Sequence, residues 1–150
     1  MRLIGNIEAK VDLKGRVFLP AAFRKVLLTA QPQGLIMRKD VFQDCLVLYP
    51  ESVWNEQMDT LRQKLNRWNK THQQVFRQYV SEVEAVGLDH NGRFLIPKRY
   101  MQMAGIRQSV RFIGMGDTIE VWATEKVEHP FMDAEQFGQA LEQLISSPEE

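Results

Sequence analysis

The sequence has few of the features that mark secreted, membrane or metal-dependent proteins. Its single cysteine, Cys45, excludes an intramolecular disulfide and suits a reducing, cytoplasmic setting. No stretch approaches the roughly 18 consecutive apolar residues of a membrane span. Charges interrupt the apolar pairs of the first 12 residues, which is unlike a signal peptide. The three histidines lie far apart, without a partner at metal-ligand spacing. We therefore expect no membrane span, no cofactor and no metal.

Net charge is also lacking, because 19 basic and 19 acidic residues cancel at neutral pH. A neutral chain is not coated with cations to hold a polyanion. The charges are nevertheless uneven. Residues 1–50 hold eight Lys or Arg against four acids, a net of +4, whereas residues 125–150 hold one lysine against seven acids, a net of −6. The basic N-terminal third could bind nucleic acid, or it could be an ordinary solvated surface.

One nine-residue segment occurs twice. Residues 12–20 read D-L-K-G-R-V-F-L-P and residues 89–97 read D-H-N-G-R-F-L-I-P, so Asp, Gly, Arg and Pro recur at an offset of 77. After each proline, apolar residues follow at i, i+3 and i+4, as on one face of a helix. They are Phe23, Val26 and Leu27 in the first copy, and Tyr100, Met103 and Ala104 in the second. The chain is therefore predicted to contain two copies of one module.

Each module is predicted to run strand, tight turn, return strand, helix. Alternating apolar residues over 7–11 favour a half-buried strand, with a rougher counterpart over 83–88. The return strands are expected over 17–19 and 94–96. Each ends at a proline that suits the first position of a helix, and Gly105 is expected to end the second helix.

The turns have recognisable chemistry. Asp12 and Asp89 are expected to begin them, since a carboxylate can accept hydrogen bonds from backbone N–H groups just ahead of it. Gly15 and Gly92 are expected to close them at positive φ. These four residues are interpreted as structural.

Further elements are predicted from apolar periodicity and capping residues. They are strands over 45–50 and 118–123, and helices over 51–68, 70–80 and 133–147, the last capped by Asp133. Trp54 and Trp122 lie within apolar stripes and are interpreted as core anchors rather than platforms for stacked bases. Cys45 is expected to be an inert buried thiol, and residues 38–40 a solvated loop. No nucleophile with a nearby base and no phosphate-binding glycine loop is present, so no enzyme is indicated.

These motifs resemble those of the MraZ family of bacterial regulators. The matching segments are D-L-K-G-R at 12–16, C-L-V-L-Y-P with Trp54 at 45–54, D-H-N-G-R at 89–93, and I-G-M-G with I-E-V-W at 113–122. The resemblance covers residues 1 to about 128. It implies an α+β fold, a tandem-repeat, swapped-hairpin AbrB-like β-barrel with flanking helices, in which the two halves of one chain act as two subunits. On this interpretation residues 5–50 and 82–124 are the repeats, 51–80 a helical connector and 125–150 an acidic helical tail.

The resemblance also implies a function. The protein would be a sequence-specific DNA-binding regulator that represses the division and cell-wall gene cluster, its own gene included. It would bind tandem operator repeats of double-stranded DNA as a ring-shaped homo-oligomer, in the cytoplasm and at the nucleoid, without membrane or small-molecule substrate. Two alternatives remain open: an AbrB-like antitoxin that binds DNA and a toxin, and a structural ring protein that binds no nucleic acid.

DNA binding is carried over to three residues, Arg16, Lys14 and Arg93. A guanidinium beside a tight turn can clamp phosphate or read guanine in the major groove. Alternatively, each arginine only stiffens its turn through an ion pair with the leading aspartate.

The two loops are expected to differ in charge. His90 and Asn91 stand where the first copy has Leu13 and Lys14, and Met101 stands where it has Arg24. The second loop is therefore predicted to be less cationic and to contribute less to binding.

Overall fold

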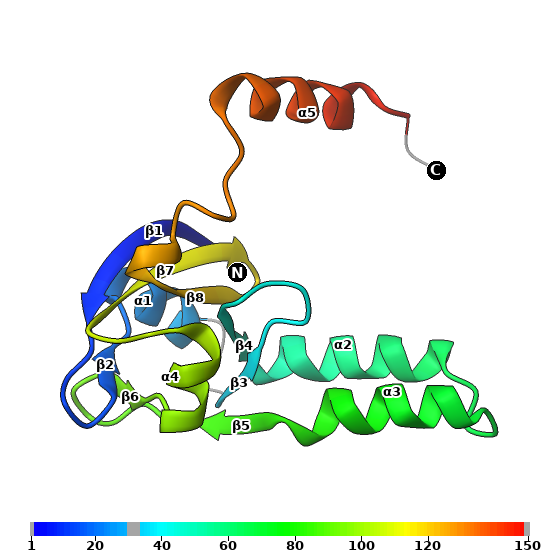
Figure 1. The fold of residues 1–150 in the computed structure, drawn as a ribbon, viewed down its shortest axis with the longest axis horizontal. Helices are drawn as coiled ribbons and strands as arrows, with labels where there is room; N and C mark the ends of the chain where they lie inside the picture. Colours follow the sequence, from blue (N-terminus) through cyan, green and yellow to red (C-terminus); the bar gives the residue numbers. More distant parts are fainter. Residues whose placement is uncertain (1, 30–33, 149–150) are drawn as a thin grey trace.

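The computed structural model describes residues 2–29 and 34–148 (Figure 1). Residues 30–33 of the first predicted repeat, and 149 and 150 of the predicted tail, lie outside the described residues. The strands are β1 (Leu3–Lys10), β2 (Arg16–Phe18), β3 (Leu35–Lys39), β4 (Leu46–Pro50), β5 (Val83–Val86), β6 (Arg93–Leu95), β7 (Ser109–Gly116) and β8 (Ile119–Ala123). The helices are α1 (Ala21–Thr29), α2 (Glu51–Lys64), α3 (Lys70–Ser81), α4 (Lys98–Ala104), the 3-10 turn η1 (Thr124–Lys126) and α5 (Ala134–Ser146).

The two repeats exchange strands. The main sheet is antiparallel and has the order β1-β7-β8-β4-β3-β5, and β2 pairs with β6 in a separate two-stranded ribbon. The first strand of each repeat therefore pairs with the third strand of the other, with Ile7 opposite Phe112 and Ile36 opposite Ala85. This exchange confirms an α+β fold of tandem swapped repeats. The ladders of the described residues leave β1 and β5 at the ends of the sheet order.

The core is assembled from both repeats because of this exchange. Val17 and Phe94 face each other across the ribbon and are 1% and 2% exposed. They join a core cluster with Phe23 of α1 and Tyr100 of α4, one aromatic side chain from each repeat. Phe112 of β7 completes this region, its ring centroid 6.1 Å from that of Phe94 in an edge-on contact. Neither repeat can bury its apolar face without the other.

The short helices start slightly later than the sequence predicts. Pro97 has φ −58° and ψ 148°, so it caps α4 with an extended backbone instead of forming the first helical residue. Gly105 ends α4 in the left-handed conformation, as predicted. Met103 is exposed, contrary to its predicted place on the apolar face, and Met101 packs against the core instead. The apolar stripe of this seven-residue helix runs through Tyr100, Met101 and Ala104.

The prediction of a solvated loop at 38–40 is wrong. Arg38 lies on β3, between β4 and β5, and is 7% exposed. Its Nη1 donates to the carbonyl oxygen of Lys39 at 2.7 Å and its Nε to that of Tyr79 at 3.3 Å. The guanidinium also lies 4.8 Å from the centroid of the Tyr79 ring. The period-2 pattern of the strand was not recognised because a charged residue interrupts it. The two hydrogen bonds and the contact with the Tyr79 ring offset the free-energy cost of burying the Arg38 charge.

The predicted core anchors are buried. Trp54 is 6% exposed and stacks on Tyr79 at a centroid distance of 5.1 Å. Trp122 is 1% exposed and donates from its indole N–H to Glu120 at 2.9 Å. Cys45 is fully buried, and this burial raises the pKa of its thiol well above the ordinary value. These positions confirm the interpretation of all three as interior residues.

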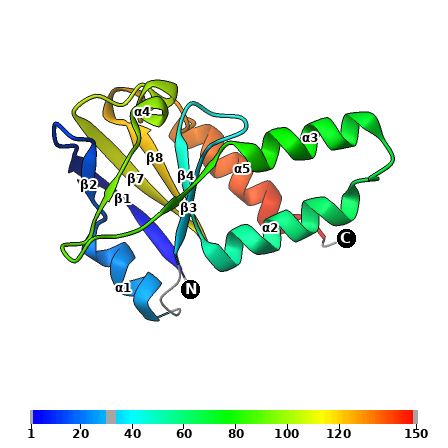
Figure 2. The same cartoon turned by 90° about the horizontal axis from the view of Figure 1, so that it is seen from below.

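Two helical features project from the sheet (Figures 1 and 2). Helices α2 and α3 form a hairpin, and α2 ends four residues before the predicted Trp68, because the backbone becomes extended at Leu65. Figure 1 shows α5 standing apart from the sheet, beyond a linker whose first residues, 127–130, form turns. Asp133 caps α5 as predicted, accepting from the backbone N–H of Gln136. Within the described ranges, no helix combines the length and apolarity needed to cross a bilayer.

Candidate nucleic-acid interface

The first D-x-x-G-R loop is organised by the carboxylate of Asp12. One carboxylate oxygen accepts from the backbone N–H groups of Lys14 and Arg16, both at 2.9 Å, and the other accepts from Nε of Arg16 at 2.8 Å. Gly15 donates its backbone N–H to the Asp12 carbonyl at 3.0 Å. These donors, above all the Arg16 backbone N–H, lower the pKa of Asp12 below its ordinary 3.8.

The second loop repeats this geometry bond for bond. Asp89 accepts from the backbone N–H groups of Asn91 and Arg93, both at 2.9 Å, and from Nε of Arg93 at 3.0 Å. Gly92 donates to the Asp89 carbonyl at 3.0 Å, and the pKa of Asp89 is lowered for the same reasons, with the Arg93 backbone N–H the largest cause. In both loops the Asp carboxylate and the Gly backbone N–H thus take part in the hydrogen bonds of the turn.

The two loops are bonded to each other. The backbone N–H of Ile96 donates to the Gly15 carbonyl at 2.9 Å, and that of Leu19 donates to the Gly92 carbonyl at 3.0 Å. Gly15 has φ +87°, and a Cβ atom there would lie 2.8 Å from the carbonyl oxygen of Ile96. Only glycine combines this φ with such a close backbone approach. The loops of the two repeats are therefore joined into one hydrogen-bonded surface.

The ribbon between the loops has one buried and one exposed face. In its register Arg16 lies opposite Leu95 and Phe18 opposite Arg93, and these four side chains alternate with the buried pair Val17 and Phe94. Phe18 and Leu95 are 54% and 52% exposed. The Arg93 guanidinium lies 5.8 Å from the centroid of the Phe18 ring. The outward face therefore presents two arginines and two apolar side chains.

Each arginine is held at one end only. Arg16 and Arg93 give Nε to the aspartate of their own turn, and within the described part of the chain no hydrogen bond from their Nη atoms is formed. The ion pair that could have explained these residues structurally does exist. It also fixes the direction of each guanidinium and leaves its terminal nitrogens available for an acceptor outside the chain.

The strand exchange also moves a cation from one loop to the other. Arg24 of α1 donates from Nη1 to the carbonyl oxygen of Asn91 at 3.2 Å, so it lies at the second loop. Met101 of α4, its counterpart, lies beside Gly15 in the first loop. The sequence argument counted Arg24 with the first loop, and that placement is wrong, because neighbours in sequence are separated by the exchange.

The first loop gains other cations from the second repeat. A cleft of about 460 Å³ beside it is lined by Lys14 of the loop together with Lys98 and Arg107. The Lys14 side chain is exposed. Sequence reasoning missed Lys98 and Arg107 and assigned Arg24 to the wrong loop, because only the exchanged topology places these residues next to the D-x-x-G-R loop of the other repeat. Their basic character was the only signal present in the sequence.

No metal site accompanies these loops. In residues 2–29 and 34–148, no group of three or more His, Cys, Asp or Glu side chains is arranged to hold a metal ion. The chemistry of the surface is that of guanidinium and ammonium donors around a short ribbon, which suits an anionic ligand.

Comparison with known proteins gives the family. The family described as "MraZ protein, putative antitoxin-like" matches residues 3–78 and again residues 79–145. The second match includes α5 and so extends beyond the limit of about residue 128 that the motifs indicated. Both halves of the chain are thus copies of the same family unit.

Relatives named "Transcriptional regulator MraZ" are similar over nearly the whole chain. The relative from Phocaeicola vulgatus is 62% identical over 147 residues, which is 98% of this chain and 96% of its own. That from Bacteroides thetaiotaomicron is 60% identical over 146 residues, 97% of this chain and 94% of its own. A more distant relative from Clostridium tetani is 31% identical over 144 residues, 94% of this chain and 97% of its own. This chain therefore belongs to the MraZ family of transcriptional regulators.

Proposed function

We propose that this regulator acts by binding double-stranded DNA through the ribbon β2–β6 and its two flanking loops. It represses the division and cell-wall gene cluster, its own gene included, as a ring-shaped homo-oligomer on tandem operator repeats. Its site of action is the cytoplasm, at the nucleoid, and it carries out no catalysis. The observation that supports this most directly is the outward face of the ribbon, with two arginines aimed away from the core.

A two-stranded ribbon fits the major groove of B-DNA, where arginine can bond O6 and N7 of guanine through two N–H groups. In the proposed complex Arg16 and Arg93 use their Nη atoms in this way or on phosphate. The aspartates keep the guanidiniums from turning away. Phe18 and Leu95 lie between the arginines and can contact thymine methyl groups.

The surrounding cations contribute phosphate contacts. Lys14, Lys98 and Arg107 flank the first loop, and Arg24 flanks the second. Such contacts position a protein on the duplex without reading its sequence. The first loop has more of them, so it makes the larger share of the binding free energy.

A chain of zero net charge needs several such surfaces at once. A ring of copies presents one ribbon per copy, and tandem operator repeats engage them together, which raises affinity through effective concentration. The exposed apolar faces outside the core also support assembly.

The test is fluorescence anisotropy of the full chain on DNA from upstream of its own gene, over a salt series. Specific binding should appear with two or more repeats, fall linearly with log salt, and be absent on shuffled DNA. A single repeat bound as tightly as an array would contradict the avidity argument. A stable ring that binds neither the upstream DNA nor the shuffled DNA would overturn the proposed function. The structural ring protein would then be the remaining alternative. The antitoxin alternative would require that DNA binding change when a toxin occupies the tail.

A further inference from the structure

Helix α5 carries an exposed apolar face. Phe137, Leu141, Leu144 and Ile145 follow one another at i, i+4, i+7 and i+8, which places them on one side of the helix. Their exposed fractions are 55%, 43%, 76% and 75%. Figure 1 shows the helix away from the sheet and from the α2–α3 hairpin. A face of this kind on a regular, capped helix marks an interaction surface.

The charge of this segment has one sign. Residues 127–148 contain four acids and no lysine or arginine. Glu135 and Glu142 are seven residues apart, so they lie on the same side of α5, about 60–80° around the helix from Ile145 at the edge of its apolar face. A partner that covers the apolar face therefore meets these carboxylates only at its margin.

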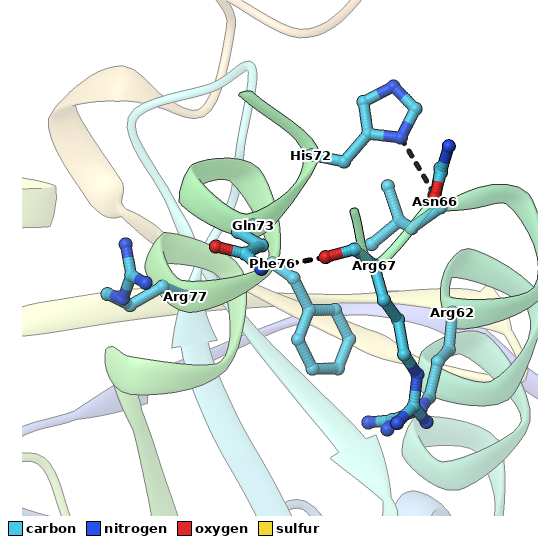
Figure 3. A pocket seen from close by; sticks show the side chains of 8 residues that line it. Arg62, Asn66, Arg67, His72, Gln73, Phe76 and Arg77 are labelled. Atoms are coloured by element: carbon cyan, nitrogen blue, oxygen red, sulfur yellow. Dashed lines mark hydrogen bonds between the residues drawn. The ribbon is translucent and has the colours of Figure 1, made fainter. Parts of the chain in front are cut away.

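The tip of the α2–α3 hairpin, residues 62–77, has the opposite character. It contains five lysines and arginines and no acid. It also encloses a pocket of about 340 Å³, whose apolar part is formed by Leu65 and Phe76 and whose rim carries Arg62, Arg67 and Arg77. Figure 3 shows Phe76 in the middle, with Arg62 and Arg67 extending to one side of it and Arg77 on the other.

The tip is a built surface rather than a loose turn. Asn69 caps α3, since its side chain accepts from the backbone N–H of His72 at 3.1 Å. The ring nitrogen Nδ1 of His72 accepts from the backbone N–H of Asn66 at 2.9 Å. Gln73 donates to the carbonyl oxygen of Arg67 at 2.7 Å. The Arg62 guanidinium lies 5.5 Å from the centroid of the Phe76 ring. Among the described residues, no ion pair involves a cation of the tip or an acid of residues 127–148.

We propose that α5 of one copy docks on the hairpin tip of a second copy. Its apolar face fills the pocket beside Phe76, and Glu135 and Glu142 meet the arginines of the rim. The proposal rests on the oligomeric part of the proposed function and specifies its interface. Since a helix meets a different surface of its neighbour, the contact is heterologous and can close into a ring.

The topology favours a second copy over the same chain. Strand β8 runs antiparallel to β4, with Val121 opposite Leu46, so it leads toward the Leu46 end of β4. Helix α2 begins at the other end, after Pro50, and its 14 residues carry the tip about 21 Å farther out. The linker between Val127 and Asp133 spans at most about 20 Å when fully extended. In the structure it is folded into turns, with the backbone N–H of Phe131 donating to the Glu128 carbonyl at 3.3 Å, so reaching toward its own tip would require these turns to open.

Charge reversal of each surface in the full chain provides the test. The variants Glu135→Lys/Glu142→Lys and Arg67→Glu/Arg77→Glu should each raise the concentration for half-dissociation at least tenfold, measured by light scattering and mass photometry. Mixing the two variants should restore assemblies of parental mass that contain both chains. In the mixture, the lysines on α5 of one variant can pair with the glutamates on the hairpin of the other. The native α5 of the second variant can likewise pair with the native hairpin of the first.

Matched substitutions check the apolar part. Leu144→Ser on the apolar face should weaken assembly, whereas Gln139→Ser on the opposite side of α5 should not. Circular dichroism should show that every variant is folded.

The possible results distinguish the proposed interface from the proposed ring. Charge-reversed variants that keep the parental mass would overturn the interface without contradicting the ring. A monomeric parent would remove both the ring and its interface. If Arg67→Glu/Arg77→Glu kept its mass but lost DNA affinity, the tip would be a DNA surface instead. A failure of the mixture to rescue assembly would show that α5 docks within one chain.

Discussion

Arg24 of the first repeat donates to the carbonyl oxygen of Asn91 in the second, at 3.2 Å. The two residues are 67 positions apart in the chain, and the contact exists because each repeat completes the other. Met101, the counterpart of Arg24 in the second repeat, lies beside Gly15 in the first loop but carries no charge. The helix of one repeat thus determines the electrostatic surroundings of the other repeat's loop.

Loss of either ribbon arginine should weaken DNA binding. Arg16→Ala should cost about 1–3 kcal/mol per engaged loop, and Arg93→Ala less, because fewer cations flank its loop. Anisotropy measures the affinity, with thermal midpoints and oligomer masses as controls for folding. If both variants bound operator like the parent, the arginines would serve only their turns, and each substitution would cost about 0–1 kcal/mol of stability.

Exchanging the residues that cross between repeats should redistribute phosphate contacts. Arg24→Met should weaken binding to all sequences alike and lower the slope of log affinity against log salt by about one per engaged loop. Met101→Arg should increase that slope by placing a guanidinium at the first loop. Lys25→Met, a neighbouring exposed position on the same helix, is the control. A change confined to one base of the operator would indicate that Arg24 reads sequence.

Glycine should be essential at position 15. Gly15→Ala forces a side chain into a left-handed backbone and against the Ile96 carbonyl, and should destabilise the fold by about 1–3 kcal/mol. Gly87→Ala is the matched control, because a Cβ there meets nothing within 4 Å and its φ is not positive. Denaturant unfolding of the two variants measures the difference. Equal stabilities of the two variants would show that the loops can accommodate a side chain at position 15 without strain.

Much of this fold could be predicted from the sequence, because its signals are local. The Asp–Gly turns and the prolines each depend on residues only a few positions apart, and their recurrence at an offset of 77 identified both modules and their short helices. Burial of Trp54 followed from helical periodicity for the same reason. The pattern failed at Arg38, where a charge sits in a buried strand position and is compensated by distant carbonyl groups.

The candidate site was only partly predictable. Arg16, Arg93 and Lys14 lie within the two matching segments, so the family resemblance could name them as candidates. Arg24 and Lys98 reach the loops through strands that pair across repeats, and no window of sequence contains that information. The same limit applied to β7, which was not predicted at all and whose partner β1 lies about 100 residues earlier.

The turn aspartates should make the protein sensitive to acid. Their folded pKa values lie below the ordinary 3.8, so ionised Asp12 and Asp89 stabilise the fold above that value. This contribution should be lost as pH falls from 3.8 through the depressed folded values. Thermal midpoints measured across this range should drop less steeply for Asp12→Asn and Asp89→Asn than for the parent. Carboxyl titrations by NMR that showed ordinary pKa values would contradict this.

The thiol of Cys45 should be unreactive in the native protein. It is fully buried, and burial raises the pKa of the group, so little thiolate forms at pH 8. A chromogenic disulfide reagent should label one thiol per chain in denaturant and almost none without it. Rapid labelling of the native protein would mean that β4 opens locally.

The covalent fusion of two exchanged repeats removes a constraint that a homodimer of single repeats would impose. Two identical subunits related by a two-fold axis favour a palindromic target, with the same bases read on both strands. Here the residues flanking one loop differ from those flanking the other, with Met101 at one and Arg24 at the other. In the proposed complex each half-site can therefore diverge independently, and the bound chain would have a direction along the DNA. The operators would then be repeated head to tail, with every copy of the proposed ring facing the same way.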